Sequence, residues 1–475
     1  MRFRPDGSLR RTGGGRVVFG GSPLRMWRLT PAGAALVDRA VLGEDLDVTA
    51  PAVGALVDRL VDAGALHPEP RPGAPGAPDP AEVTVVVPVR DRVAGLARLL
   101  DSLEPDRRDG VQVVVVDDGS ADAAGHALVA ASHGATLVRR GRSGGPAAAR
   151  EAGIAVATTA VVAVVDSDCV VTDGWLRPLL AHLADERVAA AAPRIATAGG
   201  TGALARYDAL RSPLDLGGEP ARVSPGTRVS YVPSAALVLR RDAHAAVGGF
   251  DPELQVGEDV DLVWRLVGSG RTVRYEPASV VEHGPRPDLA GWLGQRFAYG
   301  GSAALLDRRH PWQVAPVRCS PWSAGGWVAV AAGHPVLGAA VLAGSAAALP
   351  RRLGSPASGV PTADALRLAA LGHLGAGQQL ARAVVRAWWP AALPAALVSR
   401  RVRRVVAASV ASVAVAAAVQ ARRRDPSLGP ASLASVAGLA VLDDAAYGAG
   451  VWAGCARAGS GRALLPVLPQ RAHRL

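Results

Sequence analysis

Short apolar runs alternate with amphipathic helical patterns between residues 82 and about 310, and this alternation restricts the fold more than any other sequence feature. The runs are residues 83–87, 113–116, 136–138 and 161–165. Between the first two runs, one helical face carries Leu96, Leu99, Leu100 and Leu103. Strands that alternate with helices predict an α/β sheet of βαβ units, whose ligands bind beyond the carboxyl ends of the strands.

Motifs rich in acidic residues follow three of these runs. Pro88-Val89-Arg90-Asp91 follows the first, Asp117-Asp118-Gly119-Ser120 the second and Asp166-Ser167-Asp168 the fourth. Two carboxylates one residue apart suit a hard divalent cation held against the diphosphate of a nucleotide-sugar. An Asp-x-Asp sequence alone is weak evidence, because acidic turns are common. The position of each motif at a strand end, with Glu258-Asp259 further along the chain, carries the argument.

This ordered set of motifs resembles the family-2 glycosyltransferases, which have the GT-A fold. The resemblance implies a UDP-sugar donor and assigns its binding to Pro88, Val89, Asp91, Asp118, Arg150 and Asp166. In such enzymes the second Asp of Asp-Asp-Gly-Ser accepts a hydrogen bond from the uracil N–H, and the first-strand loop contacts the nucleoside. The helix after Gly144-Gly145 supplies Arg150, which would reach ribose or phosphate. Glu151 stands where the family usually has Asn.

The same resemblance implies a divalent metal. We expect Asp168 to be a direct ligand of Mg²⁺ or Mn²⁺, while Asp166 binds ribose or a metal-bound water. His283 follows a strand-like stretch, and in some GT-A enzymes a histidine there completes the metal site. An isolated histidine is more often structural, so both readings of His283 stay open.

Glu258-Asp259 opens a helix after the turn Gly248-Gly249-Phe250-Asp251. An inverting transfer needs one carboxylate to take the proton of the acceptor hydroxyl, and the resemblance assigns this role to Asp259. Glu258, Trp264 and Arg265 are expected on the acceptor side, where they shape the pocket. The alternative is that Glu258 and Asp259 are first-turn acids favoured by the helix dipole.

The regions on either side of residues 82–310 have different predicted structures. Residues 1–66 combine short strands with two amphipathic helices, one capped by Thr30 and one starting at Thr49, which predicts a small α+β, winged-helix-like module. It resembles the peptide-binding domains of enzymes that mature ribosomally made peptides, and a packing appendage is the alternative. Residues 67–81 are a proline-rich linker, with six prolines between His67 and Pro80. Residues 82–310 form the expected GT-A domain, and residues 311–475 a helical, apolar, basic region.

The basic charge lies in the last of these regions. The chain has no lysine; residues 1–319 carry 36 Arg and 37 acidic residues, and residues 320–475 carry 16 Arg and four Asp. The net positive charge of the whole chain is therefore a poor argument for nucleic-acid binding, and we expect the protein to bind no nucleic acid. Arg clusters beside long uncharged Ala-rich stretches predict association with the inner membrane surface, and a soluble helical domain is the alternative. Three well-separated cysteines and an N-terminus without an apolar segment predict a cytoplasmic location.

The order of these regions, with Tyr231-Val232-Pro233-Ser234-Ala235-Ala236 and residues 296–304, resembles the actinobacterial mycofactocin-system glycosyltransferases. Those enzymes are thought to add β-linked glucose from UDP-glucose to a peptide-derived redox cofactor. Two alternatives remain: a family-2 rhamnosyl- or galactofuranosyltransferase of cell-wall synthesis, and a non-catalytic peptide-binding protein. A nucleotidyltransferase is disfavoured, because its glycine-rich loop carries a catalytic Lys and this chain has none.

Overall fold

The computed structural model describes residues 1–284, 288–353 and 360–468. The chain divides into two compact units. The first unit comprises Met1–Arg11, Val18–Gly199 and Arg211–Pro285, and the second comprises Thr12–Val17, Gly200–Leu210 and Arg286–Leu475. Helices that follow the sheet in sequence therefore belong to the second unit.

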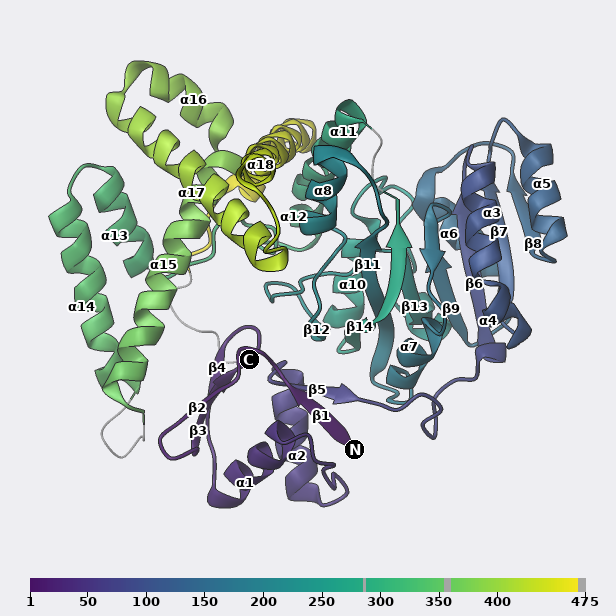
Figure 1. Cartoon of the computed structure of the whole chain (residues 1–475), viewed down its shortest axis with the longest axis horizontal. Helices are drawn as coiled ribbons and strands as arrows, with labels where there is room; N and C mark the ends of the chain where they lie inside the picture. Colours follow the sequence, from purple (N-terminus) through teal and green to yellow (C-terminus); the bar gives the residue numbers. More distant parts are fainter. Residues whose placement is uncertain (285–287, 354–359, 469–475) are drawn as a thin grey trace. The chain divides into compact units, whose positions relative to one another are not determined.

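A nine-stranded mixed sheet forms the centre of the first unit, in the order β10-β14-β11-β13-β9-β6-β7-β8, with β12 paired to β14 (Figure 1). Its strands are β6 (Val83–Val89), β7 (Gln112–Asp118), β8 (Thr136–Arg140), β9 (Val161–Val165), β10 (Cys169–Val171), β11 (Val188–Thr197), β12 (Ala221–Val223), β13 (Ala236–Arg240) and β14 (Thr272–His283). Strands β6 to β9 are mutually parallel, as the sequence predicts, whereas β13 runs antiparallel to both β9 and β11. The predicted α/β GT-A-type fold is confirmed.

Helices cover both faces of this sheet (Figure 1). Alternate strand residues point to opposite faces, so Val83, Val85 and Val87 pack with the predicted leucine stripe of α3. Gly153 of α6 lies against Val86 on the other face, where a methyl group would collide. The helices of this part are α3 (Val93–Ser102), α4 (Glu104–Arg108), α5 (Ala123–Ser132), α6 (Gly145–Val156), α7 (Leu176–His182), α9 (Arg241–Ala246) and α10 (Glu258–Gly268).

The N-terminal module combines short strands with two helices, and it has its own apolar core. Its elements are β1 (Arg2–Pro5), β2 (Arg10–Thr12), β3 (Val17–Gly20), β4 (Arg25–Arg28), α1 (Pro31–Val41), α2 (Pro51–Asp62) and β5 (Leu66–Glu69). Thr30 caps α1 by accepting from the Gly33 N–H, as predicted. The start of the second helix was predicted wrongly: it begins at Pro51, because Thr49 bonds Asp47 in the preceding turn.

The proline-rich stretch begins inside a strand. His67 and Glu69 belong to β5, which pairs antiparallel with β1. Asp79 and Glu82 cap the one-turn helix η1 (Pro80–Glu82) reciprocally, immediately before β6. Both ends of the stretch are therefore held by hydrogen bonds to neighbouring structure.

The second unit is helical. Its elements are α8 (Gly202–Arg211), α11 (Leu289–Gly301), α12 (Ala303–Arg309), α13 (Pro321–Ala331), α14 (Pro335–Leu353), α15 (Thr362–Arg386), α16 (Trp389–Val398), α17 (Arg400–Arg424), α18 (Pro430–Ala458) and η3 (Arg462–Leu464). Helices α11 and α18 touch backbone to backbone, because Gly300, Gly450 and Gly454 leave no room for a methyl group between them. The predicted helical character of this region is confirmed.

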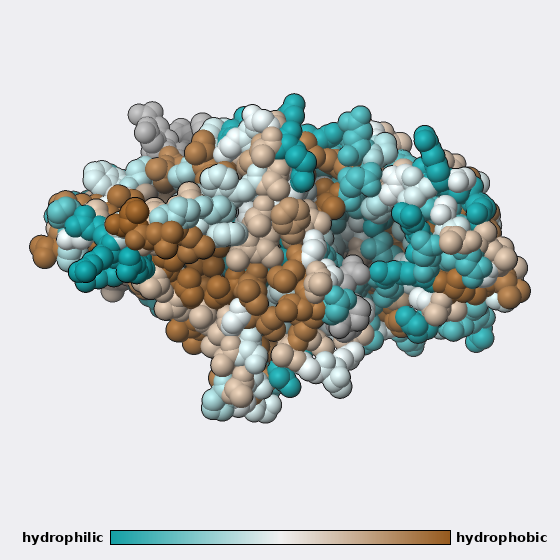
Figure 2. Space-filling model, turned by 90° about the horizontal axis from the view of Figure 1, so that it is seen from above, coloured by the Kyte–Doolittle hydropathy of each residue, from teal (hydrophilic) through white to brown (hydrophobic). Residues whose placement is uncertain are grey.

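Apolar side chains of the second unit are widely exposed. Leu397 and Val398 of α16 are 81% and 90% exposed, and Figure 2 shows hydrophobic residues gathered over the helices of this unit. Within the described residues, α14 and α17 are long and apolar enough to cross a membrane by length and composition alone, and only 6% and 11% of their apolar windows are buried. Low burial distinguishes both helices from the core helices of soluble proteins.

Candidate active site

The predicted site residues gather where β6, β7 and β9 end and where β10 and α10 begin. β14 also ends there, because its antiparallel pairing with β10 places His283 opposite Cys169. Asp166 follows β9 and donates its backbone N–H to the carbonyl of Ala235, just before β13. The sheet therefore brings together acids that lie up to 168 residues apart, from Asp91 to Asp259.

Arg150 links the loop after β9 to the start of α10. Its guanidinium donates to Asp166 and to Glu258, each at 2.7 Å, and it lies over the ring of Phe250 at 5.5 Å. The residue is only 3% exposed, and the two carboxylates hold the pKa of Arg150 above its usual range despite burial. The structure thus places Arg150 between two acids, where it positions both of them.

Asp259 lies beside Glu258 in the first turn of α10. Its carboxylate accepts from the backbone N–H of Ser234 at 3.1 Å and of Val260 at 2.8 Å. Burial raises the pKa of Asp259 above its usual range, although these two hydrogen bonds oppose the shift. Burial and the neighbouring charge of Asp259 also raise the pKa of Glu258. Both carboxyl groups therefore hold a proton more readily than an exposed acid does, and such perturbed acids are common among groups that transfer protons.

Asp168 and His283 lie together, as one reading of the sequence expected. The Nε2 atom of His283 is 3.5 Å from a carboxylate oxygen of Asp168. Arg92 forms an ion pair with the same carboxylate. Within the described part of the chain, no group of three His, Cys, Asp or Glu side chains could hold a metal ion. Asp168 and His283 supply at most two protein ligands at this point.

Asp118 turns towards the start of α6. Its carboxylate accepts from the Ser143 hydroxyl at 2.7 Å and from the backbone N–H groups of Gly144 and Gly145, and it pairs with Arg140. Burial by itself would raise the pKa of Asp118, but these donors lower it below the usual range. In this structure Asp118 therefore anchors the glycine turn, and base recognition would require it to exchange partners.

The first-strand loop has an unusual backbone. Asp91 has φ of 54°, donates its N–H to the Ser120 hydroxyl, and accepts from the Ala121 N–H at 2.9 Å. Pro88 is half-buried and Val89 is buried in the sheet core. The structure brings this loop beside the Asp-Asp-Gly-Ser turn, and the half-exposed carboxylate of Asp91 lies at their junction.

Trp264 and Arg265 support the loops that precede β13 and α10. Arg265 donates to the carbonyls of Val247 and Gly249, and Trp264 donates to the carbonyl of Ser230 at 2.7 Å. Both side chains hold backbone segments in place.

Three residues near the site were missed by the sequence reasoning. Arg92 forms an ion pair with Asp168, and the backbone N–H of Ser234 donates to Asp259. Glu151 accepts a hydrogen bond from the Phe250 N–H at 2.7 Å. The Arg-Asp-Arg sequence after the first strand was a signal for Arg92. Glu151 was seen only as a departure from Asn, although its longer side chain reaches the Gly-Gly-Phe turn.

Comparison with known proteins identifies the family of the chain. Residues 84–247 match the model of glycosyl transferase family 2. Over 471 residues the chain is 41% identical to the pre-mycofactocin glycosyltransferase of Mycobacterium tuberculosis, and the match covers 97% of this chain and 96% of the relative. The chain belongs to the pre-mycofactocin glycosyltransferases. It is therefore a sugar transferase of mycofactocin biosynthesis, with a sugar donor and an acceptor as its substrates.

Two further proteins match only part of this chain. The succinoglycan biosynthesis protein ExoU of Rhizobium meliloti is 30% identical over 206 residues, which are 40% of this chain and 58% of the relative. The mannosyltransferase PcManGT of Pyrobaculum calidifontis, solved with GDP-Man and Mn²⁺, is 22% identical with a TM-score of 0.39. That match covers 62% of this chain and 82% of the mannosyltransferase.

Proposed function

We propose that this pre-mycofactocin glycosyltransferase moves glucose from UDP-glucose, with inversion, onto the peptide-derived mycofactocin precursor to form β-linked sugars. The observation that carries the proposal is the 41% identity along almost the whole length of an enzyme named for that precursor. The cell-wall alternative receives less support, because the polysaccharide-synthesis relatives match only about two fifths of the chain.

A divalent cation fits the donor end of this site. Mg²⁺ is usually held by one or two protein carboxylates together with substrate phosphates and water, so a site with few protein ligands is typical. Asp168 and His283, 3.5 Å apart, would hold such an ion, Mg²⁺ or Mn²⁺. When bound, it would neutralise the charge that develops on the leaving diphosphate. Arg92 pairs with Asp168 and would move to a phosphate oxygen as the donor enters.

We assign the base to Asp259. The acceptor hydroxyl gives its proton to this carboxylate while its oxygen bonds to the anomeric carbon, and the bond from that carbon to the diphosphate breaks. The backbone N–H groups of Ser234 and Val260 fix the carboxylate, and burial gives it a raised pKa that suits proton uptake. Arg150 keeps Glu258 and Asp166 in position on either side.

Asp259→Asn tests this assignment. The amide keeps the size of the carboxylate but cannot accept the proton, so turnover should fall roughly 10²-fold or more while UDP binding stays nearly unchanged. Glu253→Gln, which neutralises an exposed acid on the loop before α10, should leave turnover unchanged. Wild-type turnover in Asp259→Asn would show that another group removes the proton.

We further propose that the second unit holds the enzyme on the inner face of the membrane and that residues 1–66 contribute to acceptor recognition. The first of these rests on the exposed apolar residues of α14 and α16 and on Arg400 to Arg404 and Arg422 to Arg424 at the ends of α17. Arginines close to anionic lipid contribute about 1 kcal/mol each. The proposal for residues 1–66 rests on the fact that none of the acidic residues of the active site belongs to this module.

A further inference from the structure

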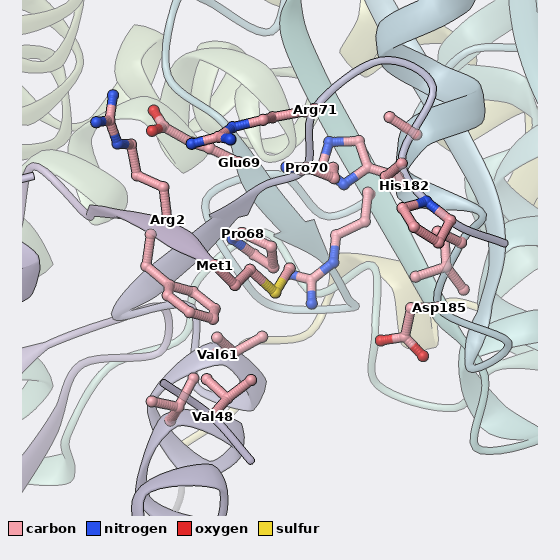
Figure 3. Close-up of a pocket in the computed structure, with 18 of the residues that line it drawn as sticks. Met1, Arg2, Val48, Val61, Pro68, Glu69, Pro70, Arg71, His182 and Asp185 are labelled. Atoms are coloured by element: carbon pink, nitrogen blue, oxygen red, sulfur yellow. The ribbon is translucent and has the colours of Figure 1, made fainter. Parts of the chain in front are cut away.

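A cavity of about 820 Å³ lies in the first unit between the N-terminal module and the sheet. Val48 and Val61 of the module face it from one side, and His182 and Asp185 face it from the other (Figure 3). Met1, just before β1, and Pro68 of β5 lie between them. The volume is that of a typical small-ligand site, and most of its exposed lining is apolar.

Arg274 of β14 lines this cavity, and within the described residues no carboxylate forms an ion pair with it, although the charges of Asp185 and Asp62 act on it from further away. The residue is 4% exposed, and its Nε and Nη1 atoms have no hydrogen-bond partner within the described part of the chain. Burial and the charge of Arg222 lower the pKa of Arg274 to about 10, so it stays protonated at neutral pH. Buried cations are normally paired, so an unpaired one beside a cavity indicates an anionic ligand.

A second arginine on the neighbouring strand makes the unpaired charge of Arg274 still less favourable. Arg222 of β12 lies directly opposite Arg274 in the antiparallel register. Like charges placed opposite each other destabilise a sheet. The Nη1 atom of Arg222 donates to the backbone carbonyl of Asp62 at 2.9 Å, which satisfies a hydrogen bond without neutralising charge. Two adjacent guanidinium groups on the sheet side therefore create a positive potential at the cavity.

Three of the acids around the cavity, Asp45, Asp58 and Asp185, are already paired with other cations. Asp185 accepts from Arg187, which also pairs with Asp58 at 3.2 Å. Asp45 pairs with Arg71 and with the terminal amino group of Met1. Arg274 is thus the buried charge that remains for an incoming anion, and a single carboxylate would match it.

This cavity is separate from the transferase site. Arg274 and His283 lie on the same strand, and their partners on β11 are Ala191 and Thr197. Those partners are six residues apart, which is roughly 20 Å in an extended strand. A molecule in the cavity therefore does not reach Asp168 or Asp259 unless it is about that long.

We propose that this cavity binds a carboxylate carried on an apolar body, with Arg274 as the group that receives the carboxylate. The apolar body packs against the valine, alanine and proline side chains of the module, and the carboxylate accepts from the free N–H groups of Arg274. Two sources share this chemistry: a small organic acid, and an acidic side chain of a peptide. The inference concerns a second site, so it does not depend on the identity of the donor sugar.

Titration calorimetry on the full-length enzyme tests the proposal with two charged probes and their neutral counterparts. The probes are hexanoate against hexanamide, and a blocked Val-Val-Glu-Val-Val peptide against the peptide with Gln in place of Glu. At least one charged probe should bind at least tenfold more tightly than its neutral counterpart. Preference for hexanoate identifies a small acid as the ligand, and preference for the peptide identifies a peptide segment.

Variants complete the test. Arg274→Met should remove the preference for charge, whereas Arg71→Met should keep it, because Arg71 lines the same cavity but is 77% exposed and paired with Asp45. Ala184→Phe fills the cavity without altering its charges and should abolish binding of both charged probes. UDP binding should be unchanged in all three variants, which also reports that they are folded. Equal binding of charged and neutral probes to the wild type, or a retained preference in Arg274→Met, would overturn the proposal.

Discussion

Replacing Arg150 by Met should damage both stability and catalysis, because this one side chain neutralises acids from two different elements. Arg150 is 3% exposed and donates at 2.7 Å to Asp166 after β9 and to Glu258 in α10. Removing one partner of a buried ion pair typically costs about 3–5 kcal/mol, since the remaining charge is left uncompensated. We expect a loss of that size in the free energy of unfolding.

A double-mutant cycle with Glu258→Gln isolates the interaction. Urea unfolding of the wild type, both single variants and the double variant should give a coupling energy of about 1–3 kcal/mol, because the two groups are in direct contact. Arg177→Met is the matched control: Arg177 and its partner Asp109 are each about half-exposed, and an exposed pair of this kind contributes less than about 1 kcal/mol.

Catalysis provides a second measurement. Without Arg150 the pKa values of Glu258 and Asp259, already raised by burial, should rise further, because the nearest positive charge is gone. A base must be deprotonated to act, so turnover of Arg150→Met at pH 7 should fall at least about tenfold and recover partly as the pH is raised. Additive unfolding energies together with a pH profile like that of the wild type would refute this reasoning.

Further outcomes follow from other parts of the molecule. Chelation by EDTA should abolish transfer, and Mn²⁺ or Mg²⁺ should restore it through Asp168; full activity in EDTA would contradict a metal role. Leu397→Glu with Val398→Glu should shift the full-length enzyme from the membrane pellet to the supernatant, while Leu128→Glu, an equally exposed site on α5, should not. Burial raises the pKa of Asp106 to about 6, so the free energy of unfolding should fall as pH rises from about 4 to about 6 and stay low above it. Asp106→Asn should flatten that slope in urea titrations and add about 1 kcal/mol at pH 7, a modest gain because the carboxyl is only half-buried; an unchanged slope would argue against a raised pKa.

The sequence predicts the first half of the sheet because its strands are unbroken apolar runs. Residues 83–87 and 161–165 read clearly as buried strands, and both are confirmed. The insertion of β13 between β9 and β11, antiparallel to both, was not predicted, because strand order depends on long-range packing. His283 reaches Asp168 only through that packing, so its position could not be read from its neighbours.

Side-chain partners explain the remaining differences. Arg150 was expected to contact the donor, yet its partners are acids 16 and 108 residues away. Asp118 was expected to face a base, and it instead accepts from a turn that lies 26 residues further on. For both Arg150 and Asp118, residue type and spacing located the side chain at the site, but they could not show which neighbouring residue would be its hydrogen-bond partner.

The glycine contact between α11 and α18 has a mechanical consequence. Side chains can interlock again after a slip of one turn, whereas Gly300, Gly450 and Gly454 allow the two backbones to meet at a single offset. The 29 residues of α18 extend for roughly 44 Å at the rise of an α-helix. This long helix therefore cannot slide along α11 in small steps, and a force applied at one end of α18 is carried to the other end without loss of register.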